Sequence, residues 1–283
     1  MTYQLALQQL ITNALAEDIG SGDHSTLCCI DSSAIGKASL NIKENGILAG
    51  IRVAEIICKQ IEPSCIFTPL KNDGEKMTIG EVAFTLQAKV HTILQAERLI
   101  LNIMQRMSGI ATLTNKYVQK LEGYHTQLLD TRKTTPNFRL LEKEAVRIGG
   151  GLNHRLGLYD MIMLKDNHID YCGGIENAIN KAYQYVQQLP LPIKIEVETR
   201  SIADVKKVMA VGKVDRIMLD NFLPEQIIEA LTLIDKKYET EASGGINYNN
   251  LQQYAATGVD FISSGAIIHQ AVSVDLSLKA ITM

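Results

Sequence analysis

The chain has 283 residues, of which 46% are hydrophobic and 21% are charged, and its formal net charge is −3. This is the composition of an ordinary globular protein, and the slightly acidic balance argues against the broad basic surface that nucleic-acid binding requires. No apolar run approaches the roughly 20 residues of a membrane span, and the first residues lack the basic start and apolar core of a signal peptide.

The first 107 residues predict a small α+β domain. A helical start is followed by short strand-like runs within residues 38–51, 74–82 and 83–90. Gly46, Gly50, Gly74 and Gly80 separate them, as turn glycines do. We expect residues 1–107 to form an N-terminal α+β sandwich that residues 270–283 complete.

A long helix is predicted over residues 91–121. Leu99, Ile103, Met107 and Ile110 recur at spacings of three or four, which places them on one helical face. This helix would connect the small domain to the next one.

From residue 127 the pattern changes to apolar runs that alternate with helical segments, which is typical of β–α–β units. Several runs are apolar almost throughout, as strands buried on both faces are. We count six, fewer than the eight of a closed barrel, and therefore predict an open, incomplete α/β barrel over residues 108–269. A doubly wound sheet is the alternative, although no G-x-G-x-x-G opens the first helix. The six runs are residues 127–131, 159–164, 193–199, 215–221, 240–245 and 260–266.

Polar side chains gather where these runs end. In barrel enzymes the active site lies at the carboxyl ends of the strands. Arg132 and Lys133 follow the first run, and His154, Arg155 and Lys165 come at comparable loop or strand ends. Any one of these residues alone would most simply be a solvated charge on the surface. Together they predict a pocket for an anionic small molecule with more than one kind of anionic group.

Two acidic residues end neighbouring runs. Glu198 lies at the end of residues 193–199, and Asp220 ends the next strand. They could hold Mg²⁺ together with substrate phosphate oxygens, or stabilise positive charge on a sugar carbon. Lys194 and Glu196 share a strand face with Glu198, and for Glu196 a role as ion-pair partner of a nearby Lys or Arg stays open.

The last two strand ends are rich in serine and glycine. Ser243, Gly244 and Gly245 follow one strand, and Gly265 follows the other. Barrels commonly bind phosphate in the loops after their last two strands, although a single Ser-Gly-Gly most often marks a plain turn. Residues 149–151, three glycines, lack the Lys-Ser/Thr of a nucleotide-binding loop and predict a flexible turn that presents His154 and Arg155.

Five cysteines without a C-x-x-C pair are expected to be buried or idle thiols in a reducing cytoplasm, and zinc is not expected.

The chain resembles a known family, the quinolinate phosphoribosyltransferases of de novo NAD synthesis. The resemblance rests on the order and spacing of EDIGSGDHST, AERLILNIMQRMSGIAT, DTRKTTP, GGGLNHRLGLYD, IMLKDNH, EVET, IMLDNF, EASGGI and ISSGAIIH, which cover nearly the whole chain. It implies a cytoplasmic pentosyltransferase that works as a homodimer with composite sites. Whether dimers assemble into hexamers stays open.

The resemblance also implies roles for single residues. Phosphoribosyl pyrophosphate would transfer its sugar to quinolinate, with loss of CO₂ and diphosphate, and Lys165, Glu198 and Asp220 would act in catalysis. Glu198 and Asp220 would also hold Mg²⁺, directly or through the substrate. Quinolinate would be bound by Arg98 of the partner subunit, Arg132, His154, Arg155 and Lys165. Phosphoribosyl pyrophosphate would be bound by Lys133, Glu198, Asp220, Ser243, Gly244, Gly245 and Gly265.

Departures from the family pattern avoid these residues. Asn137 stands where a glycine is usual, Glu144 replaces a common aromatic, and Ser264 is unusual beside Gly265. Asn tolerates a left-handed backbone better than most residues, so the turn at residue 137 should persist. Two rival functions remain: a phosphoribosyltransferase for another base, and a non-catalytic anion-binding homologue. Retention of both Glu198 and Asp220 argues against the second.

Overall fold

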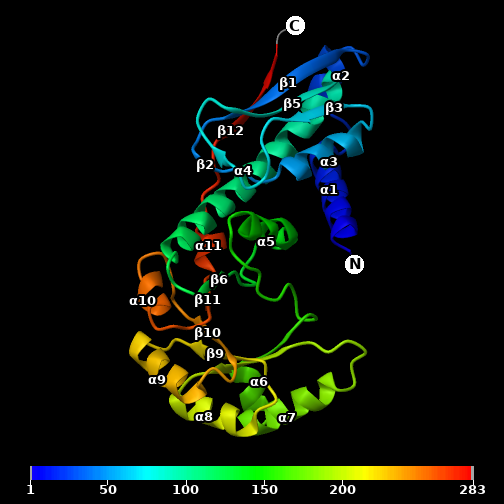
Figure 1. Ribbon diagram of the computed structural model, residues 1–283. Helices are drawn as coiled ribbons and strands as arrows, with labels where there is room; N and C mark the ends of the chain where they lie inside the picture. The colour runs from blue at the N-terminus through cyan, green and yellow to red at the C-terminus, as the bar shows by residue number, and fades with distance from the viewer. Residues whose placement is uncertain (1, 282–283) are drawn as a thin grey trace. The chain divides into compact units, whose positions relative to one another are not determined.

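The computed structural model describes residues 2–281, which form two compact units (Figure 1). Unit one comprises residues 2–115, 134–150 and 268–281, and unit two comprises residues 116–133 and 151–267. The domain boundary expected after residue 107 lies inside helix α4 (Val90–Lys120). Residues 134–150 belong to unit one, although they lie between two stretches of unit two in the chain.

Unit one is built on a four-stranded antiparallel sheet in the order β12-β1-β5-β3. The first and last strands of the chain pair with each other, with Leu40 opposite Leu278. Leu40, Phe84 and Leu86 are fully buried on this sheet. The strands are β1 (Ile35–Ile42), β3 (Ile66–Pro69), β5 (Val82–Lys89) and β12 (Leu276–Ala280), with β2 (Gly46–Ile47) and β4 (Lys76–Met77) as a separate pair; the helices are α1 (Tyr3–Ile19), α2 (His24–Cys29), α3 (Ile51–Ile61), α4 and α5 (Arg139–Ile148).

Unit two is built on a six-stranded sheet in the order β6-β11-β10-β9-β8-β7, and every neighbouring pair is parallel. Because β6 and β7 are the two edges, the sheet does not close, which confirms the predicted open, incomplete barrel. The strands are β6 (Gln127–Leu129), β7 (Ile162–Leu164), β8 (Ile195–Thr199), β9 (Arg216–Asp220), β10 (Glu239–Ser243) and β11 (Phe261–Ser263); the helices are α6 (Asp166–Tyr171), α7 (Ile175–Val186), α8 (Ile202–Val211), α9 (Pro224–Ile234) and α10 (Leu251–Ala255), and α11 (Ala266–His269) follows β11.

A single bridge extends the sheet beyond β6. Leu152 lies parallel to Leu129, its N–H donates to the carbonyl of Leu128 at 2.9 Å, and its carbonyl accepts the N–H of Asp130 at 3.0 Å. The segment that follows Leu152 is therefore held beside the exposed edge of β6.

The first two of the three glycines before this segment, Gly149 and Gly150, form a turn, as the sequence predicted. Gly149 caps α5, and a Cβ on it would lie 2.5 Å from the carbonyl oxygen of Ala111. Gly149 is therefore required for close packing of backbone on helix α4.

Two further expectations concern the whole chain. None of the described helices is both long enough and apolar enough to cross a membrane. All five cysteines carry free thiols: Cys58 and Cys65 are buried, and Cys28 and Cys29 are exposed.

Candidate active site

The loop after β6 is organised by Asp130, which is fully buried. Its Oδ1 accepts the backbone N–H of His154 at 2.8 Å, and its Oδ2 accepts the side-chain amide of Asn153 at 2.6 Å. Arg132 and Lys133 come two and three residues after it in the chain. The carboxylate thus ties the strand end that carries Arg132 to the segment that carries His154 and Arg155.

Arg132 and Arg155 lie close enough to repel each other. Burial lowers the pKa of Arg155, and the positive charge of Arg132 lowers it further, although Glu196 and Asp160 oppose the shift. The Arg155 guanidinium also donates from Nη1 to the carbonyl of Met161 at 3.3 Å. Two guanidinium groups that destabilise each other's charge favour the binding of an anion between them, because the anion offsets the repulsion.

A second group of charges lies at the ends of β7, β8 and β9. Lys165 Nζ is 3.6 Å from Glu198 Oε2, with Glu198 only 11% exposed at its side chain. Burial raises the pKa of Glu198, Lys165 opposes this, and the charge of Asp220 raises it again. The like-charge interaction places the carboxylates of Glu198 and Asp220 near each other, with one cation beside them.

The serine–glycine loop after β10 packs tightly on the end of β9. Gly244 has φ 96°, and a Cβ there would lie 2.2 Å from Asn221 Oδ1. The N–H of Asn221 donates to the carbonyl of Ser243 at 2.8 Å, and its side-chain amide donates to Asp220 at 2.6 Å. Gly245 has φ 64° and open space where a side chain would be.

Gly265 lies between β11 and the short helix α11. Beside it, Ser264 is buried and donates its hydroxyl to the carbonyl of Ile246 at 2.7 Å, so this hydroxyl faces the protein interior. Asn137 adopts the left-handed conformation that was expected of it, with φ 61°.

His154 is engaged inside unit two. Its Nε2 lies 2.9 Å from Glu196 Oε2 and 3.3 Å from Glu241 Oε2, and its Nδ1 accepts the N–H of Arg155 at 2.7 Å. The ring therefore has contacts at both nitrogens, and the binding of His154 to a substrate, which the family resemblance implies, stays a prediction.

The charges around His154 affect each other. Burial disfavours a charged ring, but the nearby carboxylates of Glu196 and Glu241 outweigh it and raise the pKa of His154 to about 9. Burial and the charge of Glu241 raise the pKa of Glu196 to about 7. The Arg155 N–H opposes a proton on Nδ1 of His154. Two carboxylates act on Nε2 at comparable distances, and they outweigh this effect.

Glu241 and Arg216 were not predicted as parts of the site. In the sheet, Arg216 lies opposite Glu196 on β8 and Glu239 on β10. Its Nη1 donates to Glu241 at 2.9 Å and its Nη2 to Glu239 at 3.0 Å. The sequence did contain a signal for them. Two strands carry acidic residues at alternate positions, Glu196 and Glu198 in one and Glu239 and Glu241 in the other, and the strand between them in the chain carries Arg216.

Arg98 differs from the other predicted site residues. It lies on α4 in unit one, where it is exposed, and all the others belong to unit two.

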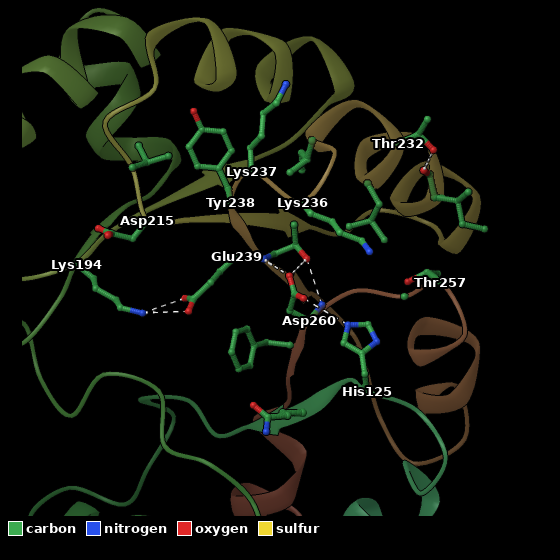
Figure 2. A pocket seen from close by; sticks show the side chains of 18 residues that line it. His125, Lys194, Asp215, Thr232, Lys236, Lys237, Tyr238, Glu239, Thr257 and Asp260 are labelled. Atoms are coloured by element: carbon green, nitrogen blue, oxygen red, sulfur yellow. Dashed lines mark hydrogen bonds and ion pairs between the residues drawn. The ribbon is translucent and has the colours of Figure 1, made fainter.

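A hollow of about 1110 Å³ lies at the other ends of the strands (Figure 2). It is lined by residues at the beginnings of the strands and by α9 and the turn that follows it, and two pairs of opposite charge lie within it. Lys194 binds Glu239 at 3.1 Å, and His125 lies 3.4 Å from Asp260, which also accepts the N–H of Thr240. Since barrels use their amino-terminal face for stability, we assign these contacts to folding.

An open α/β barrel that gathers cations and a carboxylate pair at its strand ends defines an enzyme of anionic substrates. The chain belongs to the quinolinate phosphoribosyltransferase family: models described as the N-terminal and C-terminal domains of quinolinate phosphoribosyl transferase match residues 23–108 and 110–279.

Relatives support this over the full length. A quinolinate phosphoribosyltransferase [decarboxylating] 1b of Nicotiana tabacum is 42% identical over 98% of this chain and 83% of its own. A nicotinate-nucleotide pyrophosphorylase [carboxylating] of Arabidopsis thaliana is 40% identical over 98% of this chain and 83% of its own. The structure of the nicotinate-nucleotide pyrophosphorylase of Francisella tularensis matches with a TM-score of 0.91 and 40% identity, covering 99% and 98% of the two chains.

Proposed function

We propose that this protein transfers the phosphoribosyl group of phosphoribosyl pyrophosphate to the ring nitrogen of quinolinate, giving nicotinate mononucleotide, diphosphate and CO₂. Full-length relatives named for this reaction support the proposal. The structural observation that carries it is that one parallel sheet brings two mutually repelling cations, Arg132 and Arg155, together after β6 and the carboxylates of Glu198 and Asp220 together at the ends of β8 and β9.

Quinolinate is a dianion, and its two carboxylates need several cations. We assign them to Arg132, Arg155 and Lys165 of one subunit, with Arg98 contributed by the partner in a homodimer. His154 completes the predicted set. A direct bond from His154 to the substrate requires the exchange of one of its contacts with Glu196 or Glu241, because both ring nitrogens are engaged.

The sugar donor is assigned to the adjacent group of residues. Lys133 would meet the diphosphate, and Ser243, Gly244, Gly245 and Gly265 would cradle the 5′-phosphate through backbone N–H groups. Glu198 and Asp220 offer hard carboxylate oxygens near each other, which fits Mg²⁺ bound together with phosphate oxygens. When bound there, Mg²⁺ neutralises charge on the diphosphate leaving group.

The chemistry requires two bonds to break, one to diphosphate and one to CO₂, and two to form, one from nitrogen to the sugar and one from carbon to hydrogen. The lone pair of the pyridine nitrogen attacks the anomeric carbon as the bond from that carbon to diphosphate breaks. Glu198 and Asp220 stabilise positive charge on the sugar in the transition state. The ring is then a pyridinium, which accepts the electron pair left when the 2-carboxylate departs as CO₂; a proton then adds at that carbon. Lys165 and Arg132 hold the carboxylate until it leaves.

One assay tests the proposal. The purified protein, given quinolinate, phosphoribosyl pyrophosphate and Mg²⁺, should form nicotinate mononucleotide and CO₂ in equal amounts. Replacing quinolinate by nicotinate should abolish most turnover, because a monocarboxylate leaves cations unmatched. Product from nicotinate at a similar rate would favour the rival phosphoribosyltransferase for another base. No turnover with either would favour a non-catalytic anion-binding protein.

We also infer a homodimeric, cytoplasmic enzyme. The family resemblance of the AERL segment that carries Arg98 supports a shared site, and the free thiols agree with a reducing compartment.

A further inference from the structure

Unit one contains a buried ion pair that the proposed chemistry does not use. Arg106 on α4 donates from Nε and Nη2 to Glu142 Oε1 on α5, at 3.0 and 2.8 Å. The Glu142 side chain is fully buried and that of Arg106 is 23% exposed. A buried ion pair is weak evidence for stability, because its desolvation offsets much of its attraction. Its other contacts suggest a different role.

Glu142 holds the loop that follows Lys133. Its Oε2 accepts the N–H of Thr135 at 2.8 Å, and its Oε1 accepts the Thr135 hydroxyl at 3.0 Å. Beside it, Arg139 Nε donates to the hydroxyl of Thr134 at 2.9 Å. The exposed chain two residues beyond Lys133 is thus fixed to a carboxylate that no solvent reaches.

Arg106 holds a second segment at the same time. Its Nη1 donates to the carbonyl of Ala271 at 2.7 Å and its Nη2 to that of Ile268 at 2.9 Å. Ile268 comes three residues after Gly265 in the chain. One guanidinium therefore connects the segment after Gly265 with the carboxylate that holds the segment after Lys133.

We propose that Arg106 and Glu142 are positioning residues for the sugar donor. The proposal rests on the proposed function, in which Lys133 and Gly265 bind opposite ends of phosphoribosyl pyrophosphate. The ion pair sets the spacing of the two segments that continue from these residues, and so keeps both ends of the donor site in register. Charged side chains suit this role. Glu142 accepts four hydrogen bonds and Arg106 donates four, which neutral side chains of the same size would not do.

Glu142→Gln tests the proposal while keeping the side-chain volume. Its amide NH₂ would face N–H and O–H donors, and the Thr135 loop would lose its anchor. We expect the KM for phosphoribosyl pyrophosphate to rise about tenfold and the KM for quinolinate to change by less than about threefold. Glu144→Gln is the matched control, since Glu144 is on the same helix and pairs with Arg147 at the surface; it should leave both constants unchanged.

Thr135→Ala is a second variant that removes one of the two loop contacts without touching the buried pair. It should raise the KM for the sugar donor in the same selective way, with an unchanged melting temperature. Equal rises in both KM values, or a lower melting temperature with unchanged KM values, would show a purely structural pair and overturn the proposal. These results differ from a failure of the proposed function, in which the wild-type protein itself gives no product.

Discussion

At the scale of single residues, the fold holds like charges close together near the strand ends although they repel each other. Arg155 is buried, lies near the positive charge of Arg132 and is directed by the Met161 carbonyl. A side chain held in this way is suited to bind an anion from the moment it arrives, since little rotamer freedom is lost on binding.

Arg155→Ala should therefore weaken quinolinate binding far more than sugar-donor binding. We expect at least about a tenfold loss of affinity for quinolinate, because a charge-assisted contact is removed. Calorimetric titration with each substrate measures both affinities. Arg200→Ala serves as the control, because Arg200 pairs with Asp170 at the surface. Equal loss of both substrates in the Arg155 variant would refute the assignment.

The raised pKa of His154 leads to a dependence of stability on pH. A group whose pKa is raised on folding, here from 6.5 to about 9, stabilises the fold fully below 6.5 and loses that effect as the pH rises through about 9. Glu196, with a pKa raised to about 7, acts in the same direction.

The free energy of unfolding of the wild type relative to His154→Gln should thus fall between about pH 6 and pH 9, by at most about 1.4 kcal/mol per pH unit. Urea unfolding of both proteins at several pH values measures it. A difference that stays constant would show that folding does not shift the pKa of the ring, and one that grows with pH would show that the fold keeps the ring neutral.

At the scale of elements, the register of β8, β9 and β10 decides which charges meet. Arg216 on the middle strand reaches acidic residues on both sides, Glu241 in the interior and Glu239 nearer the surface. Loss of this cation leaves the buried carboxylate of Glu241 without its guanidinium partner and with only the contact to His154.

Arg216→Met should destabilise the protein by about 3 kcal/mol, as removal of one member of a buried pair does. Lys194→Met, which removes the exposed partner of the same Glu239, should cost less than about 1 kcal/mol. Denaturant midpoints of the two variants make the comparison. Similar losses would mean that the interior pair contributes no more than the surface pair.

The strands and their polar ends could be predicted from the sequence, but the inward charges could not. Strands buried on both faces are apolar almost throughout, so a run such as residues 215–221 is recognisable without any contact information. Because both faces of such a strand are buried, the sequence does not show on which side of the sheet the side chains of Arg216 and Glu241 lie. The burial of Glu142 could not be predicted either, because an acidic residue in a helix ordinarily lies at the surface.

At the scale of the whole molecule, the assignment of Arg98 distinguishes a shared site from a site within one chain. Arg98 belongs to unit one and the remaining predicted residues to unit two, so only the proposal of a homodimer assigns it to the partner's pocket.

Mixing two inactive variants tests this. Arg98→Ala and Arg155→Ala should each have little activity alone. In a heterodimer both defects fall on one site and the other site is intact, so random reassociation should restore about a quarter of wild-type activity. Steady-state assays after joint unfolding and refolding measure the recovery. A mixture that stays as inactive as its components would place Arg98 in its own chain's site or outside the site.

The open seam of the barrel has a consequence for how new substrate preferences could arise. A closed barrel would occupy the place beside β6 with another strand, whereas here a single bridge at Leu152 is followed by a loop, residues 153–161, that leads to β7. Within that loop Leu158 and Tyr159 are exposed and lie in no strand ladder. Because both side chains are exposed, exchanges of Leu158 and Tyr159 would cost little in folding, which makes these two positions, close in sequence to Arg155, the starting point for engineering acceptance of other pyridine acids.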